Sequence, residues 1–290
     1  MRTLNHQNIQ LELFSEEFPP VVGRNIEAAD TYRGYSQPCS REEYDRRVEV
    51  VRSKIESGIA DEITISELQD WAELDWIFPQ GTFETGQKFG EKTVEEAQEY
   101  YDEIVPMQSR ALRRKPNRNT QHGKSEAGDY LWTILAMASN AGIDMEEALR
   151  AKFTAEGPVT LGDLHELTKA GASWLPLRVD NPSQVRSPQS DVQDLDPYIW
   201  LRIHPVELYR YMYKMFDGGK QSPVEATEKQ RLEATDWYAD ALVFLSYYAD
   251  HWTFSSIPEV ASVNFNKITQ RVEHGTVNKA LGNRSLMKKD

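Results

Sequence analysis

The segment Glu95-Glu96-Ala97-Gln98-Glu99 is followed, after a gap of 26 residues, by Glu126-Ala127-Gly128-Asp129. Each segment carries two carboxylates three positions apart, a spacing that places both side chains on one face of a helix. Two such helices facing each other would bring four negative charges together in the interior of the protein. A hard cation such as Mg²⁺, which prefers oxygen ligands, would relieve that repulsion. The two segments therefore predict a metal-dependent enzyme that acts on phosphates.

Composition narrows the class of protein. The chain has 290 residues, of which 27% are charged and 10% are aromatic, as expected for a folded protein. Its net charge of −13 argues against binding to a nucleic-acid backbone. A role as a DNA mimic would fit the charge alone, but an ordinary acidic soluble protein is the commoner explanation.

The compartment is predicted from cysteine usage and from apolar runs. Cys39 is the only cysteine, so no disulfide can form within the chain and a cytoplasmic location is expected. Residues 1–13 lack the apolar core of a signal peptide. No apolar run approaches the roughly 20 residues that cross a bilayer, so no membrane partner is expected.

Helical periodicity dominates the chain, and strand patterns are scarce, so we predict an all-α protein. Capping signals at Ser40, Thr93, Ser125 and Asp144 predict helix starts, and Pro106 is expected to end or kink the third helix. The first 40 residues, the basic stretch 107–124 and residues 171–195 are predicted to be irregular. The expected helices cover about 41–57, 65–74, 93–105, 125–141, 145–153, 163–169, 199–216, 225–251 and 257–272.

The C-terminal half repeats the pattern of the first half in weakened form. The apolar run that starts at Asp129 matches a run that starts at Asp240, and each is followed by a break and an acidic helix start. Lys152 then aligns with Asn264. Trp237 stands where Glu126 would be expected, and the preceding helix keeps one acid, Glu207. Two unrelated amphipathic helices remain the alternative explanation.

The ordered set of motifs resembles the MazG-like family of all-α nucleoside triphosphate pyrophosphohydrolases. The resemblance rests on the two acidic segments, on Gly128-Asp129-Tyr130-Leu131-Trp132, on residues 142–153 and on residues 65–72. It is good over about 64–156 and weak over 199–272. The family cleaves an NTP or dNTP between the α and β phosphates. The resemblance implies a MazG-like helical bundle made of two tandem repeats that pack as a pseudo-dimer within one chain.

The same resemblance assigns roles to residues. Glu96, Glu99, Glu126 and Asp129 would hold Mg²⁺, or Mn²⁺ in its place, and Glu95 with Glu96 would act in catalysis by helping to activate water. Lys152 matches a family position near the phosphates. Lys124 and Arg118 are weaker phosphate candidates, and Trp71 is a candidate for stacking on a base, although a core role is the commoner one for such a residue.

The predicted organisation has five parts. They are an N-terminal extension with one helix (1–60), a catalytic repeat (61–158), a linker (159–198), a degenerate repeat (199–275) and a basic tail (276–290). The family usually builds its bundle by pairing chains, so we expect either a monomer with internal pseudo-symmetry or a homodimer. The expected ligand is a small nucleotide; the sequence does not identify its base.

Two other classes compete with this reading. A di-iron carboxylate bundle needs Glu-x-x-His on two helices, and no Glu-x-x-His occurs in this chain. A non-catalytic nucleotide-binding or regulatory interaction protein on the same fold is the stronger rival. The presence of all four carboxylates argues against it, and release of pyrophosphate would separate the two functions.

Overall fold

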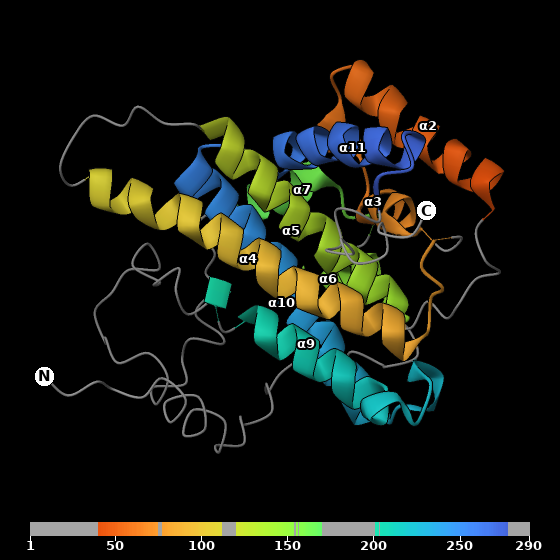
Figure 1. Ribbon diagram of the computed structural model, residues 1–290. Helices are drawn as coiled ribbons and strands as arrows, with labels where there is room; N and C mark the ends of the chain where they lie inside the picture. Colours follow the sequence, from red (N-terminus) through yellow and green to blue (C-terminus); the bar gives the residue numbers. More distant parts are fainter. Residues whose placement is uncertain are drawn as a thin grey trace, which may run out of the picture.

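A computed structural model describes residues 40–74, 77–111, 120–153, 155, 157–169, 201–202 and 204–277. Within these residues the chain forms nine α-helices and no strand, which confirms the all-α prediction (Figure 1). The predictions for residues 1–39, 171–195 and 278–290, and for Arg118, fall outside the described residues. Among the helices described, none is both long and apolar enough to cross a membrane.

Among the described residues the first helix is α2 (Arg41–Glu56), which begins and ends as its sequence predicts. The Ser40 hydroxyl accepts a hydrogen bond from the backbone N–H of Glu43. At the other end Gly58 has a φ of +74°, and its N–H bonds to the carbonyl of Ile55, while the N–H of Ile59 bonds to that of Lys54. This pair of bonds is the Schellman arrangement, which uses a left-handed glycine to satisfy the last carbonyls of a helix.

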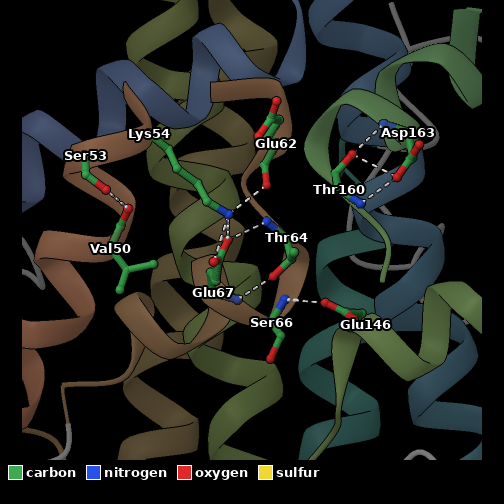
Figure 2. Close-up of polar contacts among 10 residues, drawn as sticks. All are labelled: Val50, Ser53, Lys54, Glu62, Thr64, Ser66, Glu67, Glu146, Thr160 and Asp163. Carbon is green, nitrogen blue, oxygen red and sulfur yellow. Dashed lines mark hydrogen bonds and ion pairs between the residues drawn. The ribbon is translucent and has the colours of Figure 1, made fainter. Parts of the chain in front are cut away.

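The next helix, α3 (Ile65–Ala72), starts with a capping box between Thr64 and Glu67. Lys54 reaches across from α2 to the Glu67 carboxylate (Figure 2), and the ammonium nitrogen and the carboxylate oxygen are 2.6 Å apart. Residues 64 and 160 form an isolated antiparallel bridge, which ties α3 to the start of α7 (Leu161–Lys169). These contacts join the N-terminal helices to the rest of the bundle.

Helix α4 (Phe83–Ala111) corrects two boundary predictions. It begins ten residues before Thr93 and continues beyond Pro106, so neither residue marks an end. Thr93 is fully buried inside the helix, where its hydroxyl donates a 2.6 Å hydrogen bond to the carbonyl of Phe89. A threonine that suits an N-cap can also be satisfied by the carbonyl four residues earlier, so the local motif alone does not fix a helix start.

Helix α5 (Thr120–Asn140) also starts earlier than predicted. Ser125 lies within its second turn, and its hydroxyl accepts a 2.9 Å hydrogen bond from Lys267 instead of capping the helix. The predicted loop 107–124 is therefore wrong at both ends, because α4 extends to Ala111 and α5 begins at Thr120. Gly142, with φ of +72°, follows the end of α5 as expected.

A short turn leads to α6 (Met145–Phe153), and Asp144 caps its start by accepting a bond from the N–H of Glu147. The fully buried Gln69 of α3 fixes this turn. Its amide donates to the carbonyl of Ile143 at 2.7 Å and accepts from the N–H of Met145 at 3.0 Å. The position of α6 is thus set by α3.

The C-terminal half contributes α9 (His204–Met215), α10 (Glu228–Thr253) and α11 (Ile257–Glu273), close to their predicted ranges. Capping boxes open α10 at Thr227 and α11 at Ser256. Helix α5 contacts α4, α10 and α11, and α4 contacts α9 along its other side (Figure 1). Helix α6 packs on α10.

Helices α4 and α9 approach each other closely because α4 has glycines at the contact. A Cβ added at Gly90 would lie 2.2 Å from the ring of Tyr209. The shared core is continuous through both halves of the chain, with Trp71, Tyr100 and Trp132 from one half and Tyr238 and Phe265 from the other all essentially buried.

Candidate metal centre

The acidic residues of α4 and α5 converge where the two helices pack together. Glu96, Glu99 and Glu126 each offer a carboxylate oxygen, and these three oxygens lie within 4.8 Å of one another. Glu96 and Glu126 are buried, whereas Glu99 is exposed. The i, i+3 spacing of Glu96 and Glu99 places both on the face of α4 that meets α5, as the sequence predicts.

Asp129 lies one turn from Glu126 but is engaged by the C-terminal half. Its Oδ1 accepts a 2.7 Å hydrogen bond from the side-chain amide of Asn264, and its Oδ2 accepts a short bond from the ammonium of Lys267. Both partners belong to α11. Asp129 is not part of the close three-glutamate group.

Lys92 is the counter-ion on the α4 side. Its ammonium lies 2.7 Å from Oε1 of Glu96 and 3.1 Å from the exposed Glu95 carboxylate. The second oxygen of Glu96, Oε2, is buried and has no hydrogen-bond partner among the described residues. A buried carboxylate oxygen without a donor is costly, and a cation ligand would satisfy it.

Burial raises the pKa of Glu96 to about 8; the nearby charge of Asp129 adds to the shift, and Lys92 opposes it. Burial also raises the pKa of Glu126, although the ammonium of Lys267 counteracts part of that effect. Burial disfavours the charged carboxylates in the absence of a counter-charge, so a divalent cation would lower both raised pKa values.

His122 lies at the exposed edge of the centre, one turn before Glu126 on α5. Its Nε2 is 3.5 Å from the Glu126 carboxylate, and its Nδ1 is 3.2 Å from that of Glu103 on α4. The imidazole therefore bridges the two helices on the side of the centre that faces solvent.

The two predicted substrate-binding lysines pair with acids other than the three glutamates. Lys152 of α6 binds two carboxylates of α10, Asp236 at 3.0 Å and Asp240 more closely. Lys124 forms an ion pair with Glu259 at 3.6 Å. It lines a groove of about 850 Å³ between η1 (Ala60–Glu62), α7 and the start of α11, to which none of the three glutamates contributes.

Trp71 lies in the core, with 1% of its surface exposed, and packs on Phe265 with ring centroids 5.3 Å apart. Its indole N–H points to the hydroxyl of Thr269, 3.4 Å away. This placement favours the core role and leaves the base-stacking role without structural support.

Sequence reasoning missed four residues of the centre: Lys92, His122, Asn264 and Lys267. Lys92 and His122 each stand four residues before a predicted ligand, Glu96 and Glu126, so the helical spacing would have revealed them. Asn264 was placed only as the counterpart of Lys152. Lys267 gave no signal, because its approach depends on how α11 packs on α5.

No protein-family model matches this chain, and neither a curated protein nor a solved structure does.

Proposed function

We propose that the chain is a Mg²⁺-dependent nucleoside triphosphate pyrophosphohydrolase that converts a (d)NTP to a (d)NMP and pyrophosphate. The observation that carries this proposal is the unsatisfied Oε2 of buried Glu96 within a cluster of three glutamate carboxylates. Oxygen-only ligands favour a hard cation such as Mg²⁺. The family resemblance of the two acidic motifs supplies the reaction.

The residues present fit such an ion. Glu96, Glu99 and Glu126 would hold it, and when bound it would neutralise phosphate charge and lower the pKa of a water. The exposed Glu95 lies beside the centre, where its carboxylate can accept a proton from the attacking water. Lys92 keeps both Glu95 and Glu96 in place through its two ion pairs.

The proposed architecture is two tandem MazG-like repeats packed as a pseudo-dimer. Glu96 and Asp129 are 33 residues apart, and so are Glu207 and Asp240. The contacts between the repeats are reciprocal. Helix α11 of the second reaches Asp129 on α5 of the first, and α6 of the first reaches Asp240 on α10 of the second. A shared ancestral pairing explains both contacts.

In the second repeat the acids are paired with protein cations, Arg210 from its own helix α9 and Lys152 from α6 of the first repeat. Arg210, three residues after Glu207, stands in the position that Glu99 has in the first repeat, and it binds Glu207 at 3.0 Å. Lys152 binds Asp240. With Trp237 in the place of the third acid, this set needs no metal ion, which supports a scaffold role for residues 199–275.

The test is a screen of NTPs and dNTPs with Mg²⁺, in which pyrophosphate and nucleoside monophosphate are measured as products. We expect at least one nucleotide to be cleaved to these two products, and Glu126→Gln to lose turnover by orders of magnitude. Glu84→Gln changes an exposed acid on the neighbouring helix α4; it is the control and keeps wild-type activity. Orthophosphate as the primary product, or equal activity of the Glu126→Gln variant, would contradict the proposal.

A further inference from the structure

Each oxygen of the Asp129 carboxylate already accepts one hydrogen bond from a side chain of α11. Its Oδ1 accepts from Asn264 and its Oδ2 from Lys267, and only 6% of its surface is exposed. The Lys267 ammonium also donates to the hydroxyl of Ser125, one turn earlier on α5. A metal ion bound to Asp129 would lie close to the Lys267 ammonium, and the repulsion between the two cations would disfavour this arrangement.

The packing of α11 on α5 fixes this arrangement. A Cβ added at Gly128 would lie 2.6 Å from the Cβ of Asn264, so the absence of a side chain is what allows α11 to come this close. The close approach places Asn264, and Lys267 one turn later, directly over Asp129. The distance between α11 and α5 is therefore set by the backbone at Gly128, and the contact between Asn264 and Asp129 does not depend on a flexible side chain alone.

The charge of Lys267 also reaches the glutamates. Burial raises the pKa of Glu126, and the positive charge of Lys267 opposes part of that rise. About 25% of the Lys267 side chain is exposed, so the ammonium is held at the edge of the centre and not sealed within the core. Because its ammonium binds Ser125 and Asp129, which lie on either side of Glu126 along α5, Lys267 is a fixed positive charge that the C-terminal half places next to the Glu126 segment.

We propose that Asp129 is a positioning residue and not a metal ligand: it holds Lys267 beside the three-glutamate metal site, where the ammonium binds the phosphate groups of the ligand. This inference rests on the proposed function for the identity of that ligand. It gives the second repeat a direct part in the site, in addition to its role as scaffold, because the anion would be held between a metal ion on the first repeat and Lys267 on the second.

The first arm of the test measures Mn²⁺ affinity by the EPR signal of the free ion. Asp129→Asn combined with Lys267→Met removes the ion pair as a unit, so the net charge of the centre does not change. This double variant should bind Mn²⁺ within about threefold of wild type. Glu126→Gln, which removes a ligand, should weaken binding at least about tenfold. A double variant that loses as much affinity as Glu126→Gln would show that Asp129 is a ligand and overturn the proposal.

The second arm measures binding of pyrophosphate to the Mn²⁺-loaded protein by calorimetry. Losing a charged hydrogen bond to phosphate should lower the affinity of Lys267→Met about tenfold or more, whereas Lys267→Arg should keep most of it. Circular dichroism of each variant confirms that the helices remain. Unchanged pyrophosphate affinity in Lys267→Met would overturn the role of this residue.

These outcomes separate the inference from the proposed function. A wild-type chain that binds Mn²⁺ and pyrophosphate as described but cleaves no nucleotide would leave the inference standing and refute the enzyme. A chain that cleaves nucleotides, and whose double variant behaves like Glu126→Gln, would refute the inference alone. Absence of Mn²⁺ binding to the wild-type chain would overturn both.

Discussion

Replacing Glu96 with Gln should stabilise the metal-free protein. The Glu96 carboxylate is buried beside Asp129 and has one oxygen without a partner, so its negative charge is unfavourable when no cation is bound. Gln has nearly the same shape and no charge. The variant should therefore remove this cost, at the expense of leaving Lys92 with Glu95 as its remaining acidic partner on α4.

The pKa of Glu96 sets both the size and the sign of the expected change in stability. The folded pKa of Glu96 is about 8, against an ordinary value of 4.5. Because the folded pKa is raised, the protonated side chain favours the folded state, and that contribution is complete below pH 4.5 and is lost as the pH rises to 8. Each pKa unit corresponds to about 1.4 kcal/mol, so the advantage of Gln has a ceiling of about 3 kcal/mol at pH 7 and about 5 kcal/mol above pH 8. At pH 5 it should be below about 1 kcal/mol.

Urea unfolding in EDTA at pH 5, 7 and 8.5, followed by circular dichroism, measures this difference. Glu84→Gln is the control, since that side chain is exposed on the same helix and should leave stability unchanged at every pH. In saturating Mg²⁺ the order should reverse, because only the wild type gains the full binding free energy of the ion. A Glu96→Gln variant that is less stable than wild type in EDTA at all three pH values would refute the reasoning.

Three further perturbations test the architecture. Lys152→Met should cost about 3 kcal/mol in urea unfolding, because it leaves the buried Asp240 carboxylate without its ammonium; a loss below about 0.5 kcal/mol would contradict the buried pair. Gly128→Ala should cost about 1–3 kcal/mol in the same assay, because the added methyl group collides with Asn264, and wild-type stability would show that α11 does not approach α5 so closely. Truncation after residue 195 should expose the faces of α4 and α5 that contact α9 and α10, and so cause aggregation or dimerisation in size-exclusion chromatography; a soluble, active, monomeric 1–195 fragment would contradict the scaffold role.

Helix ends that depend on local backbone chemistry could be predicted from the sequence. Gly58 ends α2 because a left-handed turn there suits glycine, and the Thr64–Glu67 pair starts α3 through bonds within four residues. The helix starts that the same reasoning predicted at Thr93 and Ser125 were wrong. Both fit a capping position, yet both lie inside helices whose length is set by packing against other helices, where their hydroxyls bond to Phe89 and Lys267.

Some residues of the candidate site could also be predicted from the sequence, and others could not. Glu96, Glu99 and Glu126 follow from helical spacing, because residues three apart share a helix face. The partners of Asp129 could not be predicted, since Asn264 and Lys267 lie more than 130 residues away along the chain and reach it only through the α5–α11 contact. The placement of Lys152 on α10 likewise depends on how the two repeats pack.

Hydrolysis of the preferred nucleotide in ¹⁸O-labelled water, with Mg²⁺ and mass spectrometry of both products, tests the central claim most directly. Attack of water on the α phosphorus predicts one ¹⁸O atom in the nucleoside monophosphate and none in the pyrophosphate. Label in pyrophosphate or in orthophosphate, or no Mg²⁺-dependent product with any nucleotide, would contradict the account.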